Sequence, residues 1–197
     1  MWKRWNWLSN LIDIPTLEPE ERRRRKLLGI MLLAAAAGAL IMIVALLVTA
    51  GLGSQGEPEE VARLWLGVVA MLLGTAGIYA LNRYVSGDLA STLFLLLLIV
   101  IAALSDEPHQ VANGRGLFLF AIPILAASVL LRPGASLVVA GLSSLTIAVV
   151  GLCGIPHHVP NISAMAGFFL LALVAWLSAR SLERALSDLK TLNEQLD

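Results

Sequence analysis

Long apolar runs separated by short polar connections constrain this chain more than any other feature of its sequence. Six runs can be distinguished: 27–52, 64–81, 89–104, 117–131, 135–155 and 162–179. A helix needs about 20 apolar residues to cross a hydrocarbon layer of about 30 Å. The third and fourth runs are short, so they either span with little tilt or local bilayer thinning, or form a merged or re-entrant pair. The sequence predicts an all-α integral membrane bundle of six transmembrane helices.

The composition agrees with a membrane protein and excludes several other classes. Hydrophobic residues make up 58% of the 197 residues and charged residues only 14%, which exceeds what a soluble core requires. Basic and acidic residues number 14 each, so net charge gives no indication of a nucleic-acid partner. Cys153 is the single cysteine, which excludes an intrachain disulfide and a cysteine-based metal cluster.

Basic residues beside the runs predict the orientation, because Lys and Arg resist translocation. They favour one side at every second connection: Arg22, Arg23, Arg24, Arg25, Lys26, Arg83, Arg132, Arg180 and Arg184. The other side carries only Arg63 and Arg115. We therefore expect a multi-pass protein of a bacterial inner (plasma) membrane with both termini in the cytoplasm.

Residues 1–21 form a separate unit ahead of the transmembrane domain, 22–179. Trp2, Trp5 and Trp7 alternate with basic and aliphatic residues, a mixture typical of a helix in the lipid headgroup region. The basic collar, residues 22–26, follows directly and is interpreted as a topology signal that also attracts anionic lipid. Charged residues continue up to the first apolar run, so no cleaved signal peptide is predicted.

Two prolines and three histidines mark features of the connections. Pro123 lies inside the fourth run and should kink it, and Pro133 in "LRPGAS" predicts a tight turn between antiparallel fourth and fifth spans. His109, His157 and His158 are expected on the outer side. They are weak metal or pH-sensing candidates, together with the acidic residues at 106 and 107. Adjacent histidine side chains point apart in extended backbone, so a solvated loop is the favoured interpretation.

The spans carry no ionisable residue between their ends. Proton relays and many transport sites place such residues inside the bilayer, so their absence argues against a pump or secondary transporter. No catalytic motif or cofactor site is recognised in the sequence, and the chain itself is expected not to be an enzyme.

The closing segment, 180–197, has the pattern of a cytoplasmic coiled coil. Leu182, Leu189 and Leu196 recur every seven residues, and Leu186 and Asn193 occupy the alternate core position. Leucine at d with asparagine at a favours a parallel two-stranded coil, which predicts a homodimer. The alternative is an amphipathic helix that packs on the protein's own cytoplasmic surface. So short a coil is weak alone, and we expect the chain to be a fragment of a longer protein.

Three stretches carry a resemblance to a known family: "DIPTLEPEERRRRKLLGIMLL", "LFLFAIPILAASVLLRPGASLVVAGLSSL" and "ARSLERALSDLKTLNEQLD". The chain resembles, over essentially its whole length, the six-span N-terminal membrane domain of bacterial sensor histidine kinases. Similar domains also precede diguanylate cyclases. The resemblance implies a dimeric input module whose last span continues into cytoplasmic output domains. None of the kinase residues can be carried over, because the phosphoacceptor histidine and ATP-binding boxes are missing.

These observations favour a sensory and dimerising membrane module that passes a signal through its last span to a downstream kinase or cyclase domain. The partners are the lipid bilayer and a second copy, with no nucleic acid. Two other classes remain open, a small transporter or channel and a structural subunit of a larger membrane complex.

Overall fold

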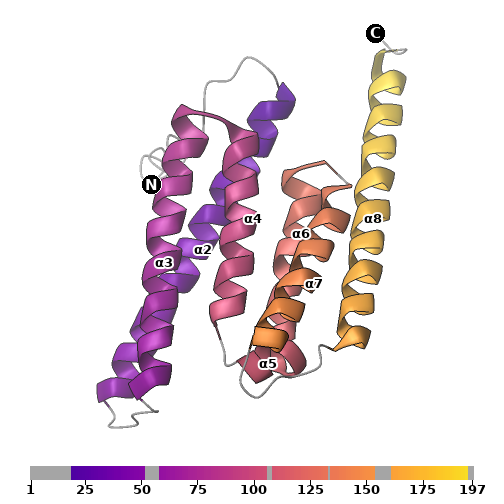
Figure 1. Cartoon of the computed structure of the whole chain (residues 1–197). Coiled ribbons are helices and arrows are strands. Elements are labelled where there is room, and N and C mark those ends of the chain that lie inside the picture. Colours follow the sequence, from indigo (N-terminus) through magenta and orange to yellow (C-terminus); the bar gives the residue numbers. More distant parts are fainter. Residues whose placement is uncertain (1–18, 52–57, 106–107, 133, 154–160, 195–197) are drawn as a thin grey trace. The chain divides into compact units, whose positions relative to one another are not determined.

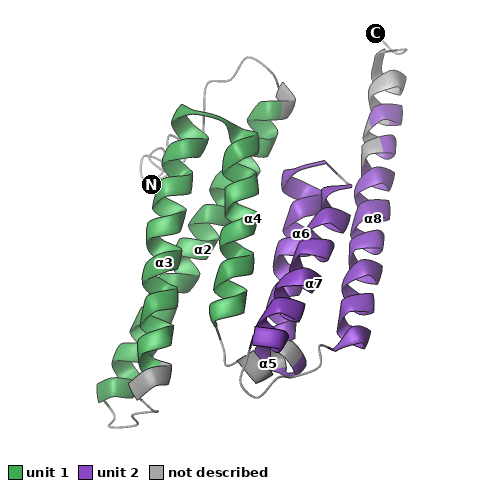
Figure 2. Ribbon diagram, viewed as in Figure 1, with its two compact units in different colours: residues 1–107 green, residues 108–197 purple. Residues whose placement is uncertain are grey.

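The computed structural model describes residues 19–51, 58–105, 108–132, 134–153 and 161–194 (Figure 1). These residues form helices and no strand, so the all-α prediction is confirmed for them. Five helical segments are long and apolar enough to cross a membrane: Glu21–Gly51, Val61–Tyr84, Gly87–Leu104, Ala135–Cys153 and Ile162–Leu182. This pattern is that of a multi-pass membrane protein. The chain divides into two compact units, 1–107 and 108–197 (Figure 2).

Unit 1 contains three mutually contacting helices, α2 (Pro19–Gly51), α3 (Pro58–Tyr84) and α4 (Gly87–Leu104). Both α2 and α3 begin at proline, whose fixed φ suits the first helical position and whose missing N–H is not needed there. Two residues separate α3 from α4, and the backbone N–H groups of Val85 and Ser86 both donate to the Leu81 carbonyl at 2.9 and 3.2 Å. This tight reversal makes α3 and α4 a helical hairpin.

Unit 2 contains a short α5 (Pro108–Asn113), the 3₁₀-helix η2 (Arg115–Phe120), α6 (Ala121–Leu130), α7 (Ala135–Cys153) and α8 (Ile162–Glu194). The helices α6, α7 and α8 all contact one another. Their interior is filled by apolar side chains that are almost fully buried, namely Phe120, Ile124, Leu130, Ile147, Phe168 and Ala172. The predicted turn between the fourth and fifth runs is present, and the Ala135 N–H closes it by donating to the Arg132 carbonyl at 2.8 Å.

The fourth apolar run differs from a regular transmembrane helix. Its apolar helical part, Gly116–Leu130, is shorter than the other five candidates and changes from 3₁₀ to α geometry at Ala121. Pro123 is the third residue of α6, so its missing N–H falls in the first turn, where no intrahelical bond is lost. The kink expected at Pro123 stays a prediction; the structure shows a change of helix type just before this residue.

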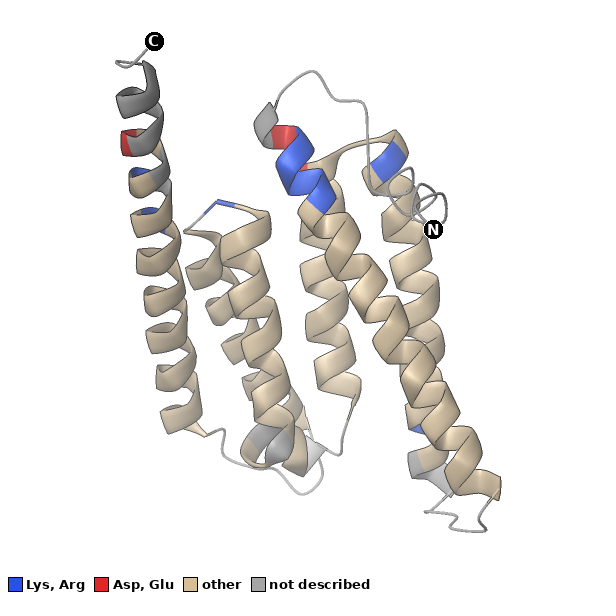
Figure 3. Cartoon of the chain, turned by 180° about the vertical axis from the view of Figure 1, so that it is seen from behind, with Lys and Arg blue, Asp and Glu red and all other residues tan. Residues whose placement is uncertain are grey.

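Charged residues in the described part of the chain lie near helix ends, at connections or in the part of α8 from Arg180 onward, which leaves the middle of each span apolar (Figure 3). In unit 1 the basic collar, residues 22–26, begins α2, and Arg83 lies in the last turn of α3. Since α2 and α3 are tied together at these ends, as shown below, the basic residues gather at one end of the unit. In unit 2, Arg132 precedes α7 and Arg180 lies beyond the apolar core of α8.

Candidate functional site

The strongest functional candidate is α8, because it joins the core of unit 2 to a polar extension. The helix starts at an Asn161 cap, whose side-chain oxygen accepts a hydrogen bond from the Ala164 N–H at 3.0 Å. From there it runs without interruption to Glu194. A helix of 33 residues is about 50 Å long at 1.5 Å per residue, which exceeds the hydrocarbon thickness of a bilayer.

The first half of α8 is fixed in unit 2 by close contacts on one face. Phe168, Ala172 and Ala175 are buried at helical spacing, and the rings of Phe168 and Phe120 lie 6.3 Å apart at 44°. The buried Ser136 hydroxyl of α7 donates to the Ala172 carbonyl at 3.1 Å. Small residues at 172 and 175 allow this approach, a common feature of helix contacts within membranes.

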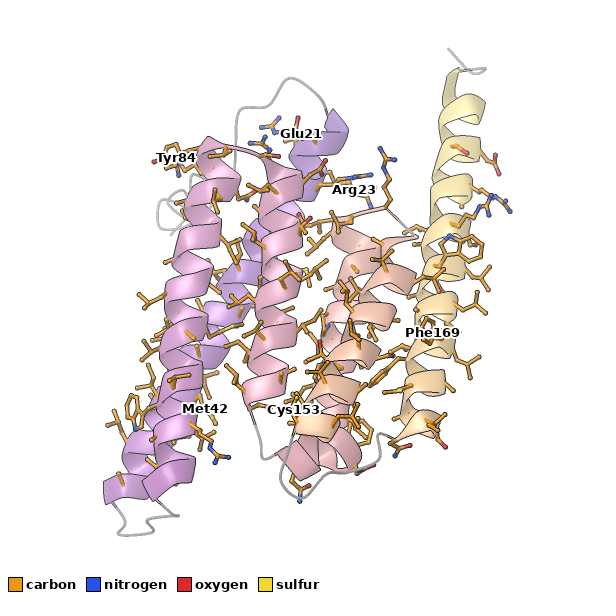
Figure 4. All side chains as sticks on the ribbon, in the orientation of Figure 1. Glu21, Arg23, Met42, Tyr84, Cys153 and Phe169 are labelled. Carbon is orange, nitrogen blue, oxygen red and sulfur yellow. The ribbon has the colours of Figure 1, made fainter. Side chains whose placement is uncertain are left out.

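Trp176 and Arg180 mark the point at which α8 leaves the core. The Arg180 guanidinium carbon lies 5.4 Å from the centre of the Trp176 ring, within range of a cation–π contact. This pair resembles the aromatic and basic residues that anchor spans at a membrane surface. Phe169, labelled in Figure 4, lies on the exposed side of the same helix.

Beyond Arg180, the side chains that the structure describes are exposed, at 181, 182, 184, 185, 187 and 188. Leu182 is 56% exposed, and Arg184, Ala185, Ser187 and Asp188 are exposed as well. The helical backbone continues past the predicted seam positions Leu186, Leu189 and Asn193, whereas Leu196 lies outside the described residues. At about 100° per residue the four helical seam positions fall on one narrow stripe. The dimer that they would form stays a prediction.

The basic collar divides into exposed residues and one structural residue. Arg22, Arg23 and Lys26 are exposed, Arg24 is partly buried, and the side chain of Arg25 is only 12% exposed. Glu21 and Arg23 are labelled in Figure 4 at the start of α2. Three of the predicted anchoring residues, Trp2, Trp5 and Trp7, lie outside the described part of the chain.

Arg25 ties α2 to α3 and approaches α4. Its guanidinium donates to the Asn82 carbonyl at 3.2 Å, the buried Asn82 amide donates back to the Arg25 carbonyl at 3.3 Å, and Glu21 accepts from the Arg25 Nε at 3.0 Å. A Cβ at Gly87 would lie 2.8 Å from the Arg25 Cγ, so glycine leaves room for this side chain. From its sequence, Arg25 was predicted to anchor the chain to lipid. Its hydrogen-bonding partner Asn82, 57 residues away, was not predicted.

The structure does not test the predicted histidine site. No group of three or more metal-ligating side chains occurs among them. His109 lies on α5, its side chain is outside the description, and His157 and His158 fall wholly outside it, as do Asp106 and Glu107. The predicted metal or pH site therefore stays untested. Cys153 ends α7 and is exposed.

Comparison with known proteins gives no family assignment, since neither a protein-family model, nor a curated protein, nor a solved structure matches the chain.

Proposed function

We propose that this protein is a membrane-embedded sensory and dimerisation module that relays a signal through α8 to a cytoplasmic output domain. The observation that supports the proposal is the continuity of α8 from the buried contacts at Phe168 and Ala172 to the exposed extension beyond Arg180. An unbroken helix transmits rotation or translation along its axis. A displacement in the core of unit 2 would therefore move the extension as well.

The extension receives this movement as one half of a parallel homodimer. Two copies pair through Leu182, Leu186, Leu189, Asn193 and Leu196. Asparagine in its core lowers the stability of the coil, so that two packings of similar stability can interconvert. In this proposal the chain has six spans with both termini in the cytoplasm, and the output is a histidine kinase or a diguanylate cyclase. The chain itself supplies no catalytic group.

Single-cysteine cross-linking in native membranes tests the dimer directly. Cys153 is exposed, so a Cys153→Ala background is needed first. Leu189→Cys places a thiol on the proposed seam, and the matched control Ser187→Cys places one about 140° away from Leu182 around the helix. We expect rapid disulfide formation between two copies at 189 and little at 187.

A second substitution addresses register. Asn193→Ile should stabilise the coil, because isoleucine packs better at an a position, and should loosen the choice of partner number and alignment. The measurement is cross-linking from 189 to other positions together with oligomer mass in detergent. Equal cross-linking at 187 and 189, or a monomer in lipid, would contradict the proposal and favour an extension that folds on its own protein.

A further inference from the structure

Unit 1 contains an apolar groove between α2 and α3. Its volume is about 340 Å³, and its walls include Gly29, Leu32 and Ala36 of α2 and Leu72, Thr75 and Tyr79 of α3. The volume is within the range of small-molecule sites. Small residues open the groove: a Cβ at Gly29 would meet no atom within 4 Å.

The groove offers few groups to a polar ligand, because only Thr75 and Tyr79 of its lining carry polar side chains. The Thr75 hydroxyl already donates to its own helix, at 2.8 Å from the Met71 carbonyl and 3.0 Å from the Leu72 carbonyl. The Tyr79 hydroxyl accepts a hydrogen bond from Arg83 at 3.2 Å. The remaining wall is aliphatic. The chemistry that fits is a hydrocarbon chain.

Basic side chains lie at one end of the groove. Arg83 follows Tyr79 by one turn of α3, and the exposed Lys26 precedes Gly29 by nearly one turn of α2. The hydrogen bonds between Arg25 and Asn82 hold these two helix ends together. Both cations therefore belong to the same edge of the unit.

The length of the groove matches one leaflet. From Arg83 to Leu72 the helix advances about 16 Å, and from Lys26 to Ala36 about 15 Å, at 1.5 Å per residue. Half of a hydrocarbon core of about 30 Å is about 15 Å. A chain that follows the groove from the basic end would thus reach the middle of the bilayer.

We propose that the groove binds one acyl chain of an anionic glycerophospholipid, with its phosphate against Arg83 and Lys26. The surrounding hydrocarbon is as apolar as the groove, so the chain gains little hydrophobic free energy by entering. Preference for this lipid must then come from the charged headgroup, which the basic residues attract. A second protein copy bound at the groove through the same face would place its basic residues beside these, and the like charges would repel. The assignment does not depend on whether α8 carries a signal.

Photo-cross-linking of the intact chain in bilayers tests the proposal. The probes are phosphatidylglycerol and phosphatidylcholine that carry the same diazirine-labelled acyl chain, each diluted into unlabelled phosphatidylcholine. We expect labelled peptides to come from residues around 29–36 of α2 and 72–79 of α3, and phosphatidylglycerol to label them more than phosphatidylcholine does. Soluble inorganic phosphate should not compete, because the chain and not the phosphate alone occupies the groove.

Two variants separate the chain site from the headgroup site. Gly29→Leu fills the groove and should lower its labelling about tenfold, since overpacking excludes the chain. The matched control Gly38→Leu lies on the opposite side of α2, where a Cβ also meets no atom within 4 Å, and should leave labelling unchanged. Arg83→Gln should lower the preference for phosphatidylglycerol about fivefold, the effect expected of one basic residue at the surface.

The outcomes are distinct. Labelling of the groove that survives Gly29→Leu would overturn the site, as would cross-links from the groove to a second copy of the chain. Equal labelling by the two lipids in the unsubstituted protein would overturn the headgroup assignment. A preference that falls with Arg83→Gln, while labelled positions stay the same, would support both parts.

Discussion

Two helices of this protein, α7 in unit 2 and α2 in unit 1, are held in different ways. In unit 2, Phe120, Ile124 and Ile147 are fully buried between helices, and 39% of the apolar stretch of α7 is buried. In unit 1 the apolar stretch of α4 is buried to the same 39%, but that of α2 only to 11%. Hydrogen bonds between Arg25 and Asn82 join α2 to α3 at one end. Packing thus holds α7 along its length, whereas hydrogen bonds at one end contribute to holding α2.

This difference indicates what each of the two regions is suited to do. Within a bilayer, helices associate through close packing and hydrogen bonds, because lipid is as apolar as another helix. Under the proposed function, a packed interior such as that of unit 2 would transmit movement to α8, since close-packed side chains cannot absorb it. Helix α2, which is little buried and is joined to α3 by hydrogen bonds at one end, borders the apolar groove to which we assign an acyl chain. Substitutions in the two regions distinguish packing from hydrogen bonding at a helix end.

The largest effect is expected in the core of unit 2. Phe120→Ala should lower the free energy of unfolding by about 3 kcal/mol, because it removes a fully buried ring that packs against Phe168. Phe118 lies in the same 3₁₀-helix but is 80% exposed, so Phe118→Ala should have little effect. Unfolding in mixed micelles by a denaturing detergent measures both. Equal losses would show that unit 2 is not held by its core.

A smaller effect is expected at the edge of unit 1. Arg25→Ala should lower the free energy of unfolding by about 1.5 kcal/mol, since it removes charge-assisted hydrogen bonds to Glu21 and to the Asn82 carbonyl. The exposed Arg23 has the same charge in the same collar, and Arg23→Ala should cost almost nothing in the same assay. If both arginines behave alike, the collar acts only as a lipid anchor.

Gly87 sharpens this test through a double-mutant cycle. Gly87→Ala should destabilise the unsubstituted protein, because the new Cβ displaces Arg25, and should be harmless or slightly stabilising beside Arg25→Ala. The coupling energy between the two positions then measures their contact. If the two substitutions lower the free energy of unfolding additively, Arg25 does not contact Gly87.

The sequence predicted the helices better than their contacts. The third run, 89–104, and the start of the fifth at 135 match α4 and α7 closely, because charge, glycine and proline mark the ends of apolar helices. The prediction of six spans is not confirmed, because five segments of the described chain qualify as spans and the fourth run begins as a 3₁₀-helix that its sequence did not indicate. Gly116 lies so close to α5 that a Cβ would be 3.0 Å from the Val111 Cα.

The tie between Arg25 and Asn82 was also beyond sequence reasoning. An arginine in a run of five basic residues reads as a topology signal, and nothing local distinguishes it from its neighbours. Its partner is 57 residues away on another helix. The groove is a property of two helices together, so it too has no signature in either segment. The stripe of Leu182, Leu186 and Asn193, by contrast, is a local repeat, and its helical backbone followed directly from it.

The smallest change in the free energy of unfolding is expected for two serines on α7. Ser136 and Ser143 are seven residues apart on one helix face, and both are fully buried. The Ser136 hydroxyl donates to the Ala172 carbonyl of α8 at 3.1 Å, whereas the Ser143 hydroxyl has no hydrogen-bond partner.

Ser136→Ala should therefore lower the free energy of unfolding by about 0.6 kcal/mol, the average for a hydrogen bond between membrane helices. Ser143→Ala should be neutral or slightly stabilising, because it removes a buried polar atom that is unsatisfied. The two substitutions match in size and burial, so the difference between their free energies of unfolding measures the hydrogen bonding of Ser136, which includes its bond to α8. If Ser143→Ala costs as much as Ser136→Ala, this hydrogen bonding contributes nothing and packing alone fixes α8 in unit 2.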